Sequence, residues 1–265
     1  MNVDRIAELL APFLSADLGH SEPAKAGEAR PKRSHEPAPN LPKAESAFLS
    51  PSQLQSISTY IDILIRWNSR INLTAIRDPE DIVTRHFGES LFAARHLFPG
   101  FSSVSPVVKD SDSANDVRVA DLGSGAGFPG LPIKIWSPNI SLTLIESNHK
   151  KAAFLSEVVR ALTLTNVNIQ NARAESLTES SLAGSMTTGA FDVVTLRAVE
   201  HFATILPTAA ALVAPAGRLA LLIGAAQQDQ ALSTLPHFNW SPSAPIPKSR
   251  SRILLVANRT SPDGE

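Results

Sequence analysis

Apolar residues recur at helical spacing in the N-terminal part of the chain. Near the N-terminus they predict a short amphipathic helix over residues 3–15. Two further helices are predicted to begin at Ser50-Pro51 and at Asp78-Pro79, because serine and aspartate cap helices and proline fits the first helical position. The polar residues 68–77 separate these two helices and read as a turn.

From position 117 onward, short apolar runs alternate with helical stretches. The predicted strands are 117–121, 141–146, 167–170, 191–196, 217–223 and 252–257. The predicted helices are 129–136, 149–161, 200–213 and 226–233. Strand–helix alternation is typical of a mostly parallel sheet with helices on both faces. The sequence therefore predicts an α/β fold of Rossmann-like character, preceded by a small helical region.

These patterns divide the chain into six segments. They are an N-terminal helix (1–18), a Pro/Ala/Lys-rich insertion (19–48), a helical region (49–100), a linker (101–116), an α/β core (117–259) and a short tail (260–265). The insertion has almost no large apolar residues, so it cannot bury enough surface to offset the entropy of ordering. We expect it to be disordered.

Composition narrows the class of protein. The 265 residues carry a formal net charge of −1, so nucleic acid would have to bind through a local patch. The absence of cysteine excludes disulfides and thiolate metal sites, and no histidines stand at metal-ligand spacing, so no metal is expected. We find neither a signal peptide nor a membrane-spanning run, which predicts a cytoplasmic protein without membrane partners.

The turn after the first predicted core strand carries the strongest chemical signal. Gly123, Gly125 and Gly127 follow Asp121 and precede a helix, so the backbone can approach a ligand closely beside free N–H groups. Glu146 ends the next strand, where a carboxylate can accept hydrogen bonds from both ribose hydroxyls of a nucleoside cofactor. An ordinary tight turn, and a Glu146 that only caps the following helix, remain alternatives.

Two cofactor classes fit this turn. Residues 125–130 match the dinucleotide pattern G-x-G-x-x-G, which leaves a dehydrogenase open. Asp121 and the earlier Gly123 favour a methyltransferase instead, because the cationic sulfonium of S-adenosylmethionine tolerates a nearby acid better than a pyrophosphate does.

Three motifs together resemble the RsmG (GidB) family of 16S rRNA guanine-N7 methyltransferases. They are Trp67-Asn-Ser-Arg-Ile-Asn-Leu-Thr-Ala-Ile-Arg-Asp78 with Arg85-His86 and Glu89-Ser90, then Asp121-Leu-Gly-Ser-Gly-Ala-Gly-Phe-Pro-Gly-Leu-Pro-Ile133, and finally Arg173-Ala-Glu175 with Phe191-Asp-Val-Val-Thr-Leu-Arg-Ala198. The resemblance covers about residues 50–225. It implies an S-adenosylmethionine-dependent methyltransferase core over 117–259 that acts on the guanine at position 527 of the rRNA in the 30S subunit.

The resemblance also implies site residues. The cofactor contacts carried over by motif are Gly123, Phe128, Ala174, Glu175 and Arg197, to which the reading of the turn adds Gly125 and Glu146. Arg197 ends the fourth core strand, where open α/β folds bind ligands, and is the candidate catalytic residue; a surface arginine is the alternative. Guanine N7 has an unprotonated lone pair, so no general base is expected, and positioning in a dry pocket would supply catalysis.

The sequence evidence for RNA-binding residues is weaker than that for the cofactor site. The candidates are Arg77, Arg85, His86 and Arg173, within a wider basic set that also includes Arg66, Arg70, Arg95 and His96. Acidic residues are interleaved with this set, so a solvated helical face is an alternative, and His86 could be a partly buried packing residue. Two departures from the family put RNA affinity in question: Ile223 stands where a lysine is expected, and the basic tail is missing. In a further departure, Glu89 replaces the usual aspartate.

Three function classes remain open: the rRNA methyltransferase, a methyltransferase of another substrate, and a cofactor-binding protein with weakened catalysis. The chain offers no extra interface element, so we expect a monomer.

Overall fold

The computed structural model describes residues 1–15, 49–99, 117–173, 176, 189–197 and 202–260. The insertion expected at 19–48 and the linker expected at 101–116 lie outside these residues, as do Ala174 and Glu175.

The N-terminal helices begin where their caps predict. The side chain of Asn2 accepts a hydrogen bond from the N–H of Asp4 at the start of α1 (Val3–Leu14). Ser50 and Gln53 form a capping box at the start of α2 (Pro51–Asn68), and Asp78 caps α3 (Pro79–Asp81). After α3 the chain continues as a π-helical segment, η1 (Ile82–Gly88), and then as α4 (Glu89–Leu97). The two predicted start points are confirmed, whereas the π-helical segment was not predicted.

A single sheet forms the centre of the molecule. Its strands are β1 (Arg118–Leu122), β2 (Ser141–Ile145), β3 (Val167–Gln170), β4 (Phe191–Arg197), β5 (Val213–Gly224), β6 (Phe238–Trp240), β7 (Ala244–Pro245) and β8 (Arg252–Arg259). Their order is β3-β2-β1-β4-β5-β8-β6, with β7 paired to β8. The first five strands are parallel, and β8 is antiparallel to β5, β6 and β7. The six predicted strands and the mostly parallel sheet are confirmed; β6 and β7 were missed.

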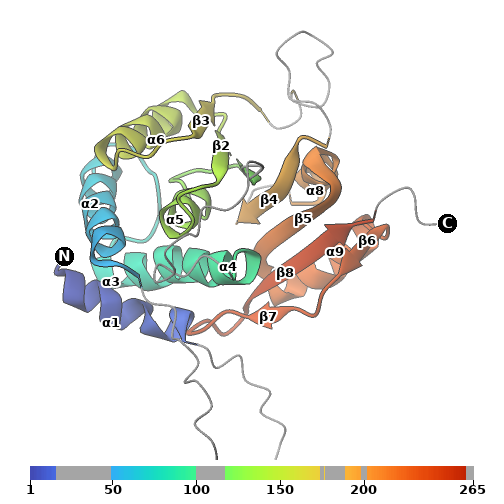
Figure 1. Cartoon of the computed structure of the whole chain (residues 1–265), viewed down its shortest axis with the longest axis horizontal. Coiled ribbons are helices and arrows are strands. Elements are labelled where there is room, and N and C mark those ends of the chain that lie inside the picture. The colour runs from blue at the N-terminus through green and yellow to red at the C-terminus, as the bar shows by residue number, and fades with distance from the viewer. Residues whose placement is uncertain (16–48, 100–116, 174–175, 177–188, 198–201, 261–265) are drawn as a thin grey trace, which may run out of the picture.

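Helices cover both faces of the sheet (Figure 1), and alternate residues of the strands belong to two separate core clusters. One layer consists of α5 (Gly130–Trp136), α6 (His149–Ala161) and the N-terminal helices, and the other of α8 (Phe202–Leu212), the short 3-10 turn η2 (Ala225–Gln227) and α9 (Gln228–Thr234). In β5, Ala220 and Leu222 join the first core cluster, whereas Leu221 and Ile223 join the second. The predicted α/β architecture is confirmed.

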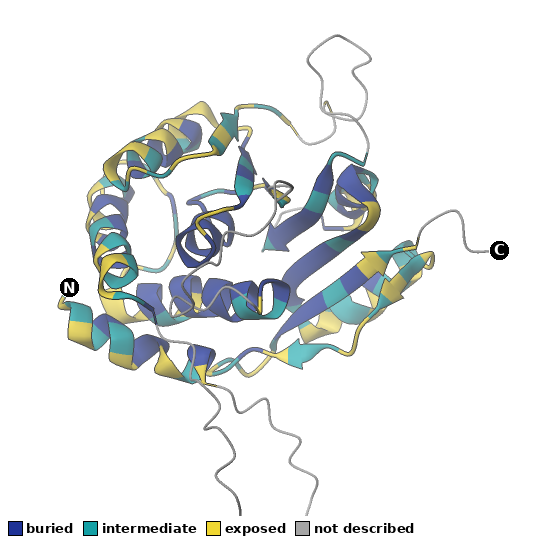
Figure 2. Ribbon diagram, viewed as in Figure 1, coloured by how far each residue is buried: buried dark blue, intermediate teal, exposed yellow. Residues whose placement is uncertain are grey.

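The N-terminal helices share the core of the α/β unit. Ile6, Leu10 and Phe13 of α1 are fully or almost fully buried in the same cluster as strand residues such as Leu142. Figure 2 shows buried segments, in dark blue, both in the N-terminal helices and in the sheet. Gly88 makes this packing possible, because a Cβ atom there would lie 2.6 Å from the Phe13 ring. The helices that carry the first sequence motif are therefore fixed against the sheet.

Candidate functional site

A cavity of about 380 Å³ opens at the ends of β1, β2 and β4. The order of the strands reverses between β1 and β4, and ligands of open α/β sheets bind outside the carboxyl ends of the strands at such a point. The lining residues are Leu73, Thr74, His86, Gly123, Ser124, Gly125, Ala126, Phe128, Glu146, Lys151, Arg197 and Ile205. Each described residue that the sequence assigns to the cofactor, namely Gly123, Gly125, Phe128, Glu146 and Arg197, lines this one cavity.

The glycine loop owes its shape to left-handed backbone conformations. Gly123, Gly125 and Gly127 have φ angles of 71°, 57° and 84°, a region that residues with a Cβ rarely adopt. At Gly127 a Cβ would lie 2.4 Å from the hydroxyl of Tyr60, so packing also requires glycine there. At Gly125 a Cβ would meet only the carbonyl oxygen of Gly123, at 3.8 Å, and would otherwise project into open space. The bare backbone of Gly125 thus leaves room for a ligand.

The carboxylate of Glu146 supports the loop. Its Oε2 accepts a hydrogen bond of 2.8 Å from the N–H of Gly125, and its Oε1 accepts one of 2.8 Å from the N–H of Asn148. Asn148, not Glu146, is the N-cap of α6. Each carboxylate oxygen has a second lone pair, so Glu146 can accept further hydrogen bonds from a ligand in the cavity that it lines.

Asp121 has a structural position beneath the loop. Its Oδ2 accepts a hydrogen bond of 3.1 Å from the N–H of Gly130, and its Oδ1 accepts one of 2.9 Å from the hydroxyl of Thr195. Burial raises the pKa of the Asp121 carboxyl to about 6. The side chain is not among those that line the cavity, and its hydrogen bonds join β1, β4 and α5.

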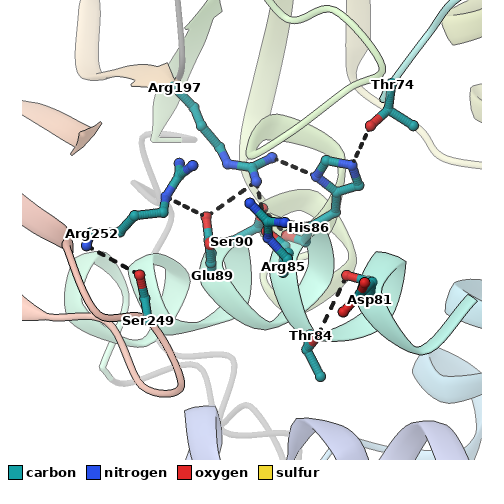
Figure 3. Close-up of polar contacts among 10 residues, drawn as sticks. All are labelled: Thr74, Asp81, Thr84, Arg85, His86, Glu89, Ser90, Arg197, Ser249 and Arg252. Atoms are coloured by element: carbon teal, nitrogen blue, oxygen red, sulfur yellow. Dashed lines mark hydrogen bonds and ion pairs between the residues drawn. The ribbon is translucent and has the colours of Figure 1, made fainter. Parts of the chain in front are cut away.

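Arg197 lies at the centre of a buried polar cluster that joins β4 to the N-terminal helices (Figure 3). Its Nη2 donates to the carbonyl oxygen of Arg85 at 2.6 Å and to Oε2 of Glu89 at 3.1 Å. The side chains of Arg197 and Glu89 are only 7% and 4% exposed. Burial lowers the pKa of the Arg197 guanidinium, and the Glu89 carboxylate opposes this shift. The alternative of a surface arginine is therefore wrong.

His86 stacks on Phe128 inside the cavity wall. The ring centroids are 4.6 Å apart with an interplanar angle of 14°, and Phe128 also stacks on Tyr60 with centroids 5.4 Å apart. Burial, together with the positive charges of Arg197, Arg85 and Arg252, lowers the pKa of His86 to about 3. His86 is therefore neutral at physiological pH, and its burial agrees with the alternative of a packing residue.

Hydrogen-bond valence fixes the tautomer of His86. Nη1 of Arg197 lies 3.0 Å from Nδ1 of His86, and a guanidinium can only donate, so Nδ1 accepts. The proton of the neutral ring is then on Nε2, which donates to the hydroxyl oxygen of Thr74 at 2.8 Å. That oxygen also accepts from the N–H of Ile76 at 3.1 Å. Within the described part of the chain, the Thr74 hydroxyl proton finds no acceptor, and Thr74 lines the cavity.

The candidate RNA-binding residues separate into two groups. Arg77, Arg85 and Arg173 have exposed side chains and do not line the cavity. His86 is only 8% exposed, so its ring could meet RNA within the cavity alone. In the wider set, Arg66 forms an ion pair with Glu157, and Arg95 donates to the backbone oxygen of Ser15 at 2.6 Å. These two arginines have structural partners.

The structure adds site residues that the sequence did not single out. Thr74 was part of a motif without a role, and Glu89 was noted only as a departure from the family. Arg252 gave no signal at all, although its Nε lies 3.1 Å from Oε2 of Glu89. Ile223, where a lysine was expected, is 4% exposed in the core, so this departure does not remove a charge from the surface.

The described residues show neither a membrane-spanning helix nor a metal-binding cluster. No helix among the described residues is long and apolar enough to cross a membrane. The described residues likewise contain no group of three or more His, Asp or Glu side chains that could bind a metal ion.

Comparison with known proteins identifies the family. Residues 53–240 match the family model for GidB, rRNA small subunit methyltransferase G. The chain is 38% identical over 202 residues to Ribosomal RNA small subunit methyltransferase G of Xylella fastidiosa strain 9a5c, a match that covers 76% of this chain and 84% of that protein. It is 34% identical over 203 residues to the protein of the same name from Xanthomonas campestris pv. campestris strain B100, covering 74% of this chain and 84% of its relative. The chain therefore belongs to the GidB family of rRNA small subunit methyltransferase G, as its motifs had indicated.

Proposed function

We propose that this chain transfers a methyl group from S-adenosylmethionine to N7 of the guanine at position 527 in the 16S rRNA of the small ribosomal subunit. S-adenosylmethionine is the cofactor of the family to which the chain belongs. The observation that carries the proposal is one cavity lined by the glycine loop, Glu146, and the chain of hydrogen bonds from Arg197 through His86 to Thr74.

The residues of the cavity suit this cofactor. Gly123 and Gly125 would let it approach the backbone, and the second lone pairs of Glu146 would accept its ribose hydroxyls. Ala174 and Glu175 follow β3 and remain our proposed contacts to the adenine edge. When bound, the cofactor supplies an electrophilic methyl group on a sulfonium. The side chains of this protein then have to bind, orient and exclude water.

The reaction requires no residue that removes a proton. Guanine N7 carries a free lone pair at neutral pH, so the catalytic contribution would come from alignment and from a dry cavity. The neutral state of His86 fits this view, because a second positive charge beside a sulfonium would weaken cofactor binding. Arg197 carries its charge beside the Glu89 carboxylate, and we assign it the role of organising the cavity at the methyl-transfer end.

Thr74 supplies a donor that could recognise the target base. Because its oxygen already accepts two hydrogen bonds, its remaining capacity is to donate its own proton. On the base edge that carries N7, guanine also presents the carbonyl O6, an acceptor, whereas adenine presents an amino group there. The Thr74 hydroxyl would therefore favour guanine over adenine.

Exposed basic residues would contact the rRNA around the target. Arg77, Arg85 and Arg173 are the candidates, because an exposed guanidinium can contact phosphates or stack on bases. His86 would meet RNA only as part of the cavity wall. We also propose that the protein is cytoplasmic, since that is where its proposed rRNA substrate would be. We propose a monomer, since Ile65, 41% exposed, is the only exposed large apolar side chain among the described residues.

The experiment is methylation with tritiated cofactor of 30S subunits that lack the modification, with naked 16S rRNA in parallel. We expect label in the 16S rRNA, mapped to one guanine by strand cleavage specific for N7-methylguanine. Subunits in which this guanine is replaced by adenine are the matched control and should stay unlabelled. Label elsewhere, or none despite measured cofactor binding, would contradict the proposed substrate.

A further inference from the structure

A second cavity, of about 330 Å³, lies between the η1–α4 helix and the loop that leads into β8. Its charged lining residues are four cationic side chains and one carboxylate, namely Arg85, Lys248, Arg250, Arg252 and Glu89. The cavity does not share the glycine loop or Glu146 with the first one. It is therefore a separate site, with a strongly basic lining.

The loop that carries three of these cations is held in place by its own backbone. The N–H of Ile246 donates to the carbonyl oxygen of Arg252 at 3.0 Å, and the N–H of Arg252 donates to the hydroxyl of Ser249 at 3.1 Å, as Figure 3 shows for the second bond. Lys248 has a φ of 57°, a left-handed conformation at the tip of the turn. The basic side chains are thus presented from a closed turn on β8.

The charges in this cavity do not cancel. The single negative charge of Glu89 is shared, because its Oε2 lies 3.1 Å from both Nη2 of Arg197 and Nε of Arg252. Within the described ranges, Arg85, Lys248 and Arg250 form no ion pair with a carboxylate inside 4.0 Å.

A further acid that interacts with Lys248, Glu80, is already engaged. The charge of Lys248 helps to lower the pKa of Glu80, but both carboxylate oxygens of Glu80 accept from Arg5, at 2.8 and 2.9 Å. Positive charge therefore exceeds negative charge around the cavity, which favours an anion.

We propose that this cavity binds a backbone phosphate of the RNA strand whose guanine enters the first cavity. This inference rests on the proposed function, which supplies a polyanionic strand next to the catalytic site. Glu89 links the two places, because it contacts Arg197 in the first cavity wall and Arg252 in the second. A phosphate bound near Arg85, Arg250 and Arg252 would fix the strand while the base is positioned.

The test measures binding of a labelled single-stranded RNA of the target region by fluorescence anisotropy at several salt concentrations. Arg250→Gln removes one exposed arginine from the cavity, and Arg160→Gln removes one from α6 as the matched control. For single strands, each lost phosphate contact makes the slope of log K against log salt shallower by about 0.7. We expect this change for Arg250→Gln, a larger one for Lys248→Gln combined with Arg250→Gln, and wild-type behaviour for Arg160→Gln.

Cofactor binding, phosphate binding and methylation distinguish failure of the phosphate site from failure of the proposed function. Cofactor affinity, measured by calorimetry, should be equal in all variants, which shows that they fold. Wild-type RNA affinity and salt slope in the double variant would overturn the phosphate site, while methylation of 16S rRNA by the wild type would still support the proposed function. Inorganic phosphate that binds the wild type but not the double variant, with an unchanged RNA slope, would mean a site for free phosphate and would also overturn the proposal. A wild type that binds the RNA but methylates neither 30S subunits nor naked 16S rRNA would instead contradict the proposed function.

Discussion

Nη1 of Arg197 lies 3.0 Å from Nδ1 of His86, although 111 residues separate the two in the sequence. This contact makes the imidazole accept on one side and donate on the other. The result is a directed chain from a buried guanidinium through a neutral ring to the hydroxyl of Thr74. The orientation of the last donor in the cavity therefore depends on a residue at the end of β4, in the same cavity wall.

Replacing the hydroxyl of Thr74 should impair methylation more than it impairs cofactor binding. Thr74→Val keeps the shape of the side chain but removes the proton donor. Because a neutral hydrogen bond contributes about 1 kcal/mol, we expect kcat/KM for 30S subunits to fall about five- to tenfold. Steady-state methylation kinetics measure this, and calorimetry should give a cofactor Kd within about twofold of the wild type.

Thr74→Ser is the matched control for this prediction, since serine keeps the donor and loses only a methyl group. Near-wild-type activity is expected for it. An equal loss in the serine and valine variants would point to packing of the methyl group and would contradict a role for the hydroxyl.

The depressed pKa of His86 should make the protein less stable in mild acid. The unfolded state takes up a proton near pH 6.5, whereas the folded state does so only near 3. Protonation therefore favours unfolding as the pH falls from about 6.5 towards 3, and it adds nothing above pH 7. The free energy of unfolding should fall by up to about 1.4 kcal/mol per pH unit from this one group.

Urea unfolding at pH 7, 6 and 5 measures this effect, with His86→Gln as the comparison. Asp121 acts in the opposite direction, since its pKa is raised to about 6, but it does so in both proteins. The difference between the two slopes thus isolates His86. Parallel pH profiles would show that the ring is protonated in the folded state near its ordinary pKa.

Arg197 should be required for both activity and stability, and the two effects can be separated. Arg197→Met leaves Glu89 buried with only Arg252 as a charged partner. Breaking a buried ion pair costs roughly 3–5 kcal/mol, and we expect the lower end because Arg252 remains. Chemical denaturation measures this loss.

Combining Arg197→Met with Glu89→Gln should recover much of that stability without recovering methylation. The double variant removes the buried carboxylate that has lost one of its two arginine partners, but it also lacks the donor to His86. If it methylated 30S subunits at the wild-type rate, Arg197 would have a structural role alone.

Local sequence signals were sufficient for the part of the site that lies on the strand ends. The glycine loop and Glu146 follow apolar runs that mark strands, and parallel strands bring their carboxyl ends to one edge. Their common cavity could therefore be predicted from spacing alone. The six longer strands were predicted for the same reason, because each carries enough apolar residues to show its period.

The remaining features depend on contacts between distant segments. Strands β6 and β7 span three and two residues, and they are defined only by their pairing with β8. The burial of His86 follows from its stacking on Phe128 in the glycine loop, and the role of Glu89 depends on Arg197 and Arg252. None of these contacts leaves a periodic trace in the sequence.

Two glycines with similar left-handed φ angles allow cofactor binding to be tested separately from folding. Gly125 and Gly189 have φ angles of 57° and 74°, and a Cβ at either would meet neighbours no closer than 3.6 Å. Replacing either by alanine should cost about 1 kcal/mol of stability, because alanine tolerates this conformation poorly. Only at Gly125 does the added methyl group enter the cavity. We therefore expect Gly125→Ala to weaken cofactor binding at least tenfold and Gly189→Ala to leave it unchanged, as measured by calorimetry, whereas equal cofactor affinities in the two variants would mean that the cofactor does not approach the loop at Gly125.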